Sequence, residues 1–116
     1  MSITAVTLDN FESVTNEDGI VIIDCWANWC PPCRQFKPIF DAAADRHSDV
    51  HFATINTEQE QKLAMELGIS SIPTLMVFRD GILLSARPGA LKANELDALL
   101  DQVRELDMDK IREETA

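Results

Sequence analysis

The feature that most constrains the fold is a continuous apolar run, IVIIDCWA, at residues 20–27. A short run rich in branched side chains cannot span a membrane, and it is typical of a β-strand covered on both faces of a sheet. The chain should therefore place this strand near the centre of a sheet and cover it with helices. A chain of 116 residues, 46% of them hydrophobic, can do so as one domain with a core that needs no disulfides.

Apolar patterns on either side of this run predict the other elements. Alternating or continuous apolar patterns predict strands at 2–8, at 49–56 and in two runs within 71–89 that Asp80 and Gly81 join as a hairpin. Helical spacing or capping residues predict helices after Asp9 or Asn10, from about Cys30, over 58–68 and from Leu91. Pro38 should kink the second helix, because it removes a backbone hydrogen bond. The order predicts an α/β fold with a central mixed sheet of about five strands flanked by about four helices.

The formal net charge of −10 argues against partners that need a basic surface. Nucleic acids and anionic membranes are bound through clusters of lysine and arginine, so we expect the chain to bind neither. Acidity gathers at the carboxyl end, where eight acidic and three basic residues lie from Glu95 onward. We interpret this end as a solvated helix face with a frayed acidic tail rather than as a docking surface.

Cysteine usage indicates the compartment. The chain has three cysteines, an odd number that a fully paired disulfide framework would not use. Two of them form one C-x-x-C, a pattern that suits a reducing cytosol. The opening segment MSITAVTLDNFES lacks the basic and apolar regions of a secretory signal. We therefore expect a cytoplasmic protein.

The stretch DCWANWCPPCR, residues 24–34, predicts reversible disulfide chemistry. A strand ends shortly before Cys30 and a helix begins near it, so this thiol should meet the free amides and dipole of a helix N-terminus, which favour the thiolate. Cys30 is thus the expected nucleophile, and Cys33, one turn deeper, is the expected resolving thiol that attacks the mixed disulfide. Pro31 and Pro32 lie in the first turn, where a missing amide hydrogen costs little.

A zinc site is the main alternative use of a C-x-x-C. It would usually need a second C-x-x-C or a Cys/His pair, but His47 and His51 are isolated and Cys25 lies within the expected central strand. We therefore expect no metal, and we interpret Cys25 as a buried structural thiol that packs like a small hydrophobe.

Asp24 is a carboxylate inside an apolar strand, where burial should raise its pKa. By strand alternation it shares a face with Ile22 and Trp26, opposite Cys25. At the carboxyl end of the strand it is placed to exchange a proton with Cys33, directly or through a water. The alternative is a structural acid that is hydrogen-bonded to backbone or to an indole. Perturbed acids beside nucleophiles are more often functional, so we predict a catalytic role.

These residues resemble the thioredoxin family over nearly the whole chain. The matched positions in the active-site stretch are Asp24 at the buried acid, Trp26 and Trp29 at the tryptophans, Cys30 and Cys33 at the redox pair, and Pro38 at the helix-kinking proline. The segment SIPTLMVF resembles the family's cis-proline segment, which implies that Ile72–Pro73 is cis and faces the disulfide. The segment RPGAL resembles the family's glycine turn at Gly89.

The resemblance implies a protein-disulfide reductase that exchanges its C-x-x-C dithiol for disulfides in client proteins. Thioredoxin reductase would recharge it with electrons from NADPH, no cofactor would be bound to the chain itself, and a monomer is expected. By analogy, the residues that bind the substrate are Trp29, Pro32, Ile72, Pro73 and Gly89. The residues that support or tune the site are Pro31, Trp26 and Pro38.

Three features depart from the family pattern. Pro31 stands where most thioredoxins have glycine, which bears on the redox potential and on compatibility with the reductase. Thr54 stands where many members have a lysine near the buried acid. The chain also continues past the usual end, so we divide it into a thioredoxin domain, residues 1–106, and an acidic C-terminal extension, residues 107–116.

Two competing functions stay open at this point. An extracytoplasmic thiol-disulfide oxidoreductase of the cytochrome-maturation kind also carries a C-P-P-C pair, although it usually has a signal or anchor and insertions that this sequence lacks. The other alternative is a thioredoxin-fold binding module whose cysteines are incidental. Thiols without turnover in insulin reduction, together with a stable partner in a pull-down, would favour the binding module.

Overall fold

The computed structural model describes residues 3–115, and its elements follow the predicted order with one addition. The strands are β1 Thr4–Ala5, β2 Ile20–Trp26, β3 Val50–Asn56, β4 Thr74–Arg79 and β5 Ile82–Pro88. The helices are α1 Phe11–Thr15, α2 Pro31–Arg46, α3 Gln61–Glu66, α4 Ala93–Arg104 and α5 Met108–Thr115. The addition is α5, which the apolar pattern did not predict.

The five strands form one mixed sheet in the order β1-β3-β2-β4-β5. β2 lies at the centre, as its apolar sequence requires, and it pairs in parallel with β3 and antiparallel with β4. β4 and β5 form the predicted hairpin. Asp80 and Gly81 have φ angles of 52° and 81°, the left-handed conformation that a tight hairpin turn needs. The predicted α/β class and mixed sheet are confirmed.

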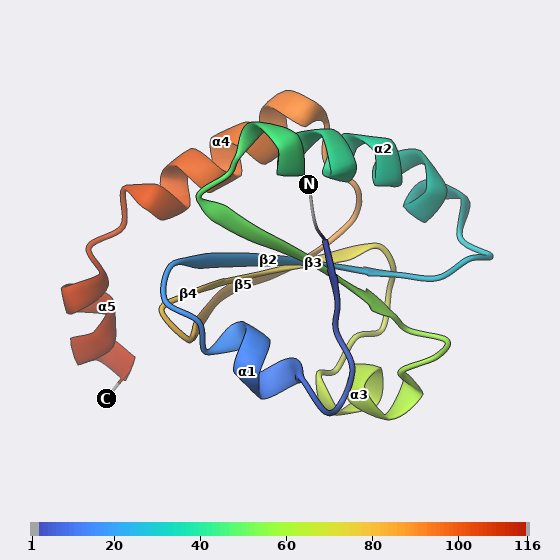
Figure 1. The fold of residues 1–116 in the computed structure, drawn as a ribbon, viewed down its shortest axis with the longest axis horizontal. Helices are drawn as coiled ribbons and strands as arrows, with labels where there is room; N and C mark the ends of the chain where they lie inside the picture. Colours follow the sequence, from blue (N-terminus) through green and yellow to red (C-terminus); the bar gives the residue numbers. More distant parts are fainter. Residues whose placement is uncertain (1–2, 116) are drawn as a thin grey trace.

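Helices cover both faces of this sheet (Figure 1). α2 and α4 pack on one face, and α1 and α3 pack on the other. Alternate residues of β2 enter the two opposite cores: Ile22 packs beneath α2 and α4, whereas Cys25 packs beneath α1 and α3. Asp24, two residues after Ile22, therefore points to the α2 side of the sheet.

Two predicted elements are shorter than expected. The strand predicted at 2–8, whose first residue lies outside the described part of the chain, forms only at Thr4–Ala5. It stops because Asn10 turns the chain, accepting a hydrogen bond from the amide of Thr7 at 2.7 Å instead of capping α1. α3 begins later than predicted, because the Asn56 side chain accepts from the two amides that follow Thr57 and holds them in a turn.

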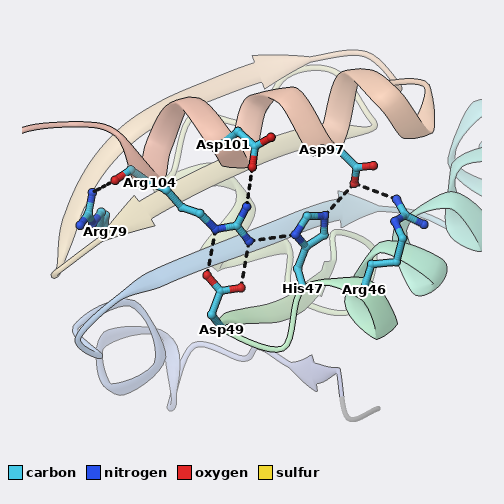
Figure 2. Close-up of polar contacts among 7 residues, drawn as sticks. All are labelled: Arg46, His47, Asp49, Arg79, Asp97, Asp101 and Arg104. Carbon is cyan, nitrogen blue, oxygen red and sulfur yellow. Dashed lines mark hydrogen bonds and ion pairs between the residues drawn. The ribbon is translucent and has the colours of Figure 1, made fainter.

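A polar network fastens α4 to the end of α2 (Figure 2). Arg104 makes two hydrogen bonds of 2.9 Å to Asp49 and one of 2.8 Å to Asp101. Its Nη2 also lies 2.8 Å from His47 Nδ1, while His47 Nε2 lies 2.7 Å from Asp97 Oδ1. Because arginine can only donate, His47 Nδ1 accepts and Nε2 carries the proton in this arrangement. Arg104 therefore makes the hydrogen bonds that connect α4 with the α2–β3 turn.

We predict that Arg104→Met lowers the free energy of unfolding by about 1 to 2 kcal/mol at pH 7, because it removes several charge-assisted bonds at once. The hydrogen bond from Arg104 lowers the pKa of Asp49. A carboxyl with a lowered folded-state pKa stabilises the fold above its unfolded pKa, and this contribution is lost as pH falls. Urea denaturation between pH 3 and 7 should therefore show that the free energies of unfolding of the wild type and Arg104→Met become more similar as pH falls. Equal stability at pH 7 would contradict this role for Arg104.

The C-terminal segment is a docked helix in its described part. α5 lies at the end of the sheet opposite the turn that follows β2 (Figure 1). Arg112 reaches Asp80 in the β4–β5 turn at 3.4 Å, and Met108 is buried. Arg79 of β4 donates to carbonyls at the C-terminus of α4, which fixes the chain just before α5. The interpretation of this end as frayed is therefore wrong for residues 108–115.

Candidate active site

Cys30 and Cys33 form a disulfide where the chain passes from β2 into α2. Their Cα atoms lie 5.2 Å apart, within the usual range for bridged cysteines. Cys30 is the N-cap of α2 with an extended backbone, and Pro31 and Pro32 occupy the first two helical positions. The strand end and helix start predicted from the sequence are therefore at the expected residues.

The start of α2 presents a donor to Cys30. The backbone amide of Cys33 donates to Cys30 Sγ at 3.3 Å. In the reduced protein the same amide and the helix dipole favour negative charge on that sulfur. The exposed fractions of the two residues, 3% and 2%, do not distinguish them. The surroundings of Cys30 and Cys33 distinguish them, because the two residues face different parts of the fold.

Cys30 faces the loop that precedes β4. The carbonyl oxygen of Ile72 lies 3.8 Å from Cys30 Sγ, and the Ile72–Pro73 peptide bond is cis. Gly89 donates its amide to the Pro73 carbonyl at 2.8 Å, which ties the end of β5 to this loop. The φ of Gly89 is 99°, a conformation that favours glycine. The cis bond and its place against the disulfide, both implied by the resemblance, are confirmed.

The predicted rim residues differ in exposure. Trp29 is 66% exposed, an unusual position for the largest aromatic side chain, and Pro32 is exposed beside it in the first turn of α2. Ile72 is half-buried and Pro73 is buried, whereas Gly89 is exposed. Of these residues, Ile72 lies against Cys30 through its carbonyl, and the Gly89 amide is bonded to the adjoining Pro73 carbonyl. Trp29 and Pro32 flank Cys30 in the chain.

Asp24 lies on β2 between Thr54 of β3 and Leu75 of β4. It is 4% exposed, and its Oδ1 atom accepts no hydrogen bond from residues 3–115. Burial raises the pKa of Asp24 to about 7, with a further rise from Asp41 and an opposing effect of Lys37. The direction of this shift is the one predicted from the sequence. The carboxyl can therefore gain or lose a proton near neutral pH.

A cavity of about 410 Å³ joins Asp24 to Cys33. Its further lining includes Trp26, Arg34, Lys37, Asp41 and Thr54. Asp24 and Cys33 thus line the same cavity, and proton exchange between them stays a prediction. Lys37 and Asp41 were not among the site residues predicted from the sequence, although their spacing from Cys33 along α2 places all three on one helix face.

The supporting residues lie where the sequence placed them. Trp26 is half-buried at the end of β2, and Pro38 lies inside α2. Cys25 is fully buried and makes no disulfide. Burial raises the pKa of its thiol to about 12, with a smaller rise from Asp24, so little thiolate forms at neutral pH. Cys25 therefore fits the predicted role of a packed, unreactive thiol.

Within residues 3–115, no group of three or more His, Cys, Asp or Glu side chains is arranged to hold a metal ion. Among the helices of the same segment, none has the length and apolarity that crossing a bilayer demands.

Comparisons with known proteins match this geometry. The profile of the family described as Thioredoxin matches residues 2–102. A candidate thioredoxin 2 of Streptomyces coelicolor is 42% identical over 99% of this chain and 86% of that protein, and thioredoxin of Porphyra purpurea is 39% identical over 88% and 97%. The crystal structure of Malassezia sympodialis thioredoxin, Mala s 13, superposes with a TM-score of 0.78 at 32% identity, covering 87% of this chain and 90% of that one. The chain therefore belongs to the thioredoxin family, as a thiol-disulfide oxidoreductase whose redox-active disulfide joins Cys30 and Cys33.

Proposed function

We propose that this thioredoxin reduces disulfides in client proteins with Cys30 as nucleophile, Cys33 as resolving thiol and Asp24 as the proton acceptor of Cys33. One observation carries the assignment. Asp24 and Cys33 line the same cavity, whereas Cys30 Sγ accepts a hydrogen bond from the Cys33 amide at the start of α2 and faces Ile72. The helix start thus stabilises a thiolate at Cys30, and Asp24 is the base available to Cys33.

The reaction proceeds in two exchanges. The Cys30 thiolate attacks one sulfur of the client disulfide, the other client sulfur leaves as a thiolate, and a mixed disulfide forms. Asp24 then takes the proton of Cys33, and the Cys33 thiolate attacks Cys30 Sγ. The second client sulfur leaves as a thiolate, and the Cys30–Cys33 disulfide closes. Two electrons pass from the dithiol to the client.

The client segment binds in an extended form across the rim formed by Trp29, Pro32, Ile72, Pro73 and Gly89. The exposed indole of Trp29 and the exposed Pro32 offer apolar contact area. The backbone of Ile72, beside the reacting sulfur, pairs with the client backbone as an added strand would. Recognition through backbone suits a protein that acts on several clients.

Thioredoxin reductase recharges the disulfide with electrons from NADPH, and the protein acts as a monomer in the cytoplasm. Family membership supports the reductase as partner. The unpaired thiol of Cys25 supports a reducing compartment. No bound cofactor is needed, because the C-x-x-C pair carries both electrons.

Insulin reduction coupled to NADPH oxidation tests this function. With a thioredoxin reductase present, NADPH consumption should rise in proportion to the concentration of this protein, and it should stop when the reductase is omitted. Turnover with dithiothreitol alone, but not with NADPH and any of several reductases, would favour the extracytoplasmic type of oxidoreductase. Absence of turnover with either reductant would leave only the binding module.

Pro31 makes this protein a C-P-P-C variant, and we predict that it sets the redox potential. Pro31→Gly should change the potential by on the order of 30 mV, equivalent to about 1.4 kcal/mol, because this position shapes the helix start that solvates the thiolate. Pro31 is exposed, so the denaturation midpoint should change little. Equilibration with glutathione buffers gives the potential. An unchanged potential would show that proline and glycine are equivalent here.

A further inference from the structure

A charged pair lies on the cavity that joins Asp24 to Cys33. Lys37 and Asp41 are one turn apart on α2, and Lys37 Nζ donates to Asp41 Oδ2 at 2.7 Å. Both line the cavity, yet their side chains are 70% and 43% exposed. The pair therefore extends from solvent to the space that contains the buried carboxyl.

The other elements around Asp24 offer little charge. At the positions directly opposite it, β3 supplies Thr54 and β4 supplies Leu75, and neither can be ionised. Cys25 of β2 points to the other face of the sheet. From α2 the cavity also receives Cys33 and the cation Arg34. Charges that act on Asp24 must therefore come mainly from the exposed face of α2.

Lys37 and Asp41 act on Asp24 in opposite directions. The ammonium group lowers the pKa of Asp24, and the carboxylate of Asp41 raises it. Each also partly neutralises the other through their ion pair, so that removing one group exposes the full effect of its partner. The balance matters because a base that stays protonated at neutral pH cannot accept a proton, whereas a strongly stabilised carboxylate accepts one poorly.

We propose that Lys37 and Asp41 are positioning residues that control the charge on Asp24, and thereby the pH range in which Cys33 loses its proton and resolves the mixed disulfide. This inference rests on the proposed function, in which Asp24 accepts that proton. The pair does not touch the reacting sulfurs. It acts through Asp24, from the α2 side, where Thr54 on β3 supplies no charge.

The test is the pH dependence of mixed-disulfide resolution in single-turnover experiments with a fluorescent peptide disulfide as client. Lys37→Met should move the midpoint of the rate profile to higher pH by about 0.5 to 1 unit, and Asp41→Asn should move it to lower pH by a similar amount. Lys37→Arg keeps the positive charge and should retain the wild-type midpoint. This control distinguishes an effect of the charge from an effect of side-chain packing. Lys62→Met on α3 and Asp18→Asn before β2 make the same charge changes elsewhere and should leave the midpoint in place.

The outcomes separate this inference from the proposed function. Opposite shifts in the two variants, absent from the two controls, support the inference. Unshifted midpoints, or shifts of the same sign, overturn it even if Asp24→Asn still slows resolution, and the proposed function then stands without the pair. If Asp24→Asn resolves the mixed disulfide at the wild-type rate, the proposed role of Asp24 fails and the inference fails with it.

Discussion

Cys30→Ser should lower the rate of insulin reduction by at least about 1,000-fold, to the uncatalysed background. Serine at this position cannot attack a disulfide, and neither remaining thiol can take its place. Cys25 is fully buried on the other face of the sheet, and the helix-start amide and the Ile72 loop face Cys30 rather than Cys33. The amide of Cys33 that supports negative charge on Cys30 would have no thiolate to stabilise. Insulin precipitation in dithiothreitol gives the rate.

Cys33→Ser, unlike Cys30→Ser, should still react with the client, because Cys30 can carry out the first exchange. The mixed disulfide between Cys30 and the client then accumulates, since no second thiol releases it. Non-reducing electrophoresis and intact-mass measurement should detect the covalent complex. Cys25→Val, which retains both redox cysteines, serves as the matched control and should accumulate none. A complex trapped by Cys30→Ser instead would reverse the roles of the two thiols.

Asp24→Asn should stabilise the oxidised protein and slow its turnover. The folded-state pKa of Asp24 is about 7, compared with an ordinary value of 3.8. Each pKa unit corresponds to about 1.4 kcal/mol, so the ionised acid costs up to about 4 kcal/mol, and the neutral amide avoids this cost. The same change removes the base beside Cys33, and we expect turnover to fall by about 10- to 100-fold.

The pH dependence of this stabilisation follows from the raised pKa. Below about pH 4 the carboxyl is protonated in both the folded and unfolded states, so the variant gains no advantage. Between about pH 4 and 7 the unfolded chain ionises and the folded protein does not, so the advantage of the variant grows, and above that range it levels off. Urea denaturation from pH 4 to 8.5 measures it, with the exposed Asp18→Asn as control. A variant that is less stable yet fully active would identify Asp24 as a structural acid.

Local patterns were sufficient to predict the centre of the fold and the redox pair. The apolar run of β2 requires cover on both faces, so its central position follows from its composition. Alternation along the same strand places Asp24 and Cys25 on opposite faces without any knowledge of their neighbours. The position of Cys30 at a helix start follows from the short spacing between the strand and the proline pair.

Contacts between distant elements could not be read in the same way. Lys37 and Asp41 look like an ordinary exposed ion pair until α2 is packed over β2 and the cavity beside Asp24 is formed. His47 looks isolated in the sequence because its partner Arg104 lies 57 residues away. The helix after residue 107 has a weak apolar pattern, yet its Met108 is buried and its Arg112 reaches Asp80 of the β4–β5 turn. Such features depend on tertiary packing, which periodicity does not encode.

An NMR titration of the oxidised protein, following the chemical shift of the Asp24 carboxyl carbon with pH, decides whether this buried group can act as a base for Cys33. The Asn variant identifies the resonance by its absence, and the ordinary exposed aspartates provide an internal comparison in the same spectra. We expect a midpoint near pH 7, well above the ordinary aspartate value of 3.8. A midpoint near 4 would contradict this expectation, because Asp24 would then be a weak base at neutral pH with no reason to act on Cys33.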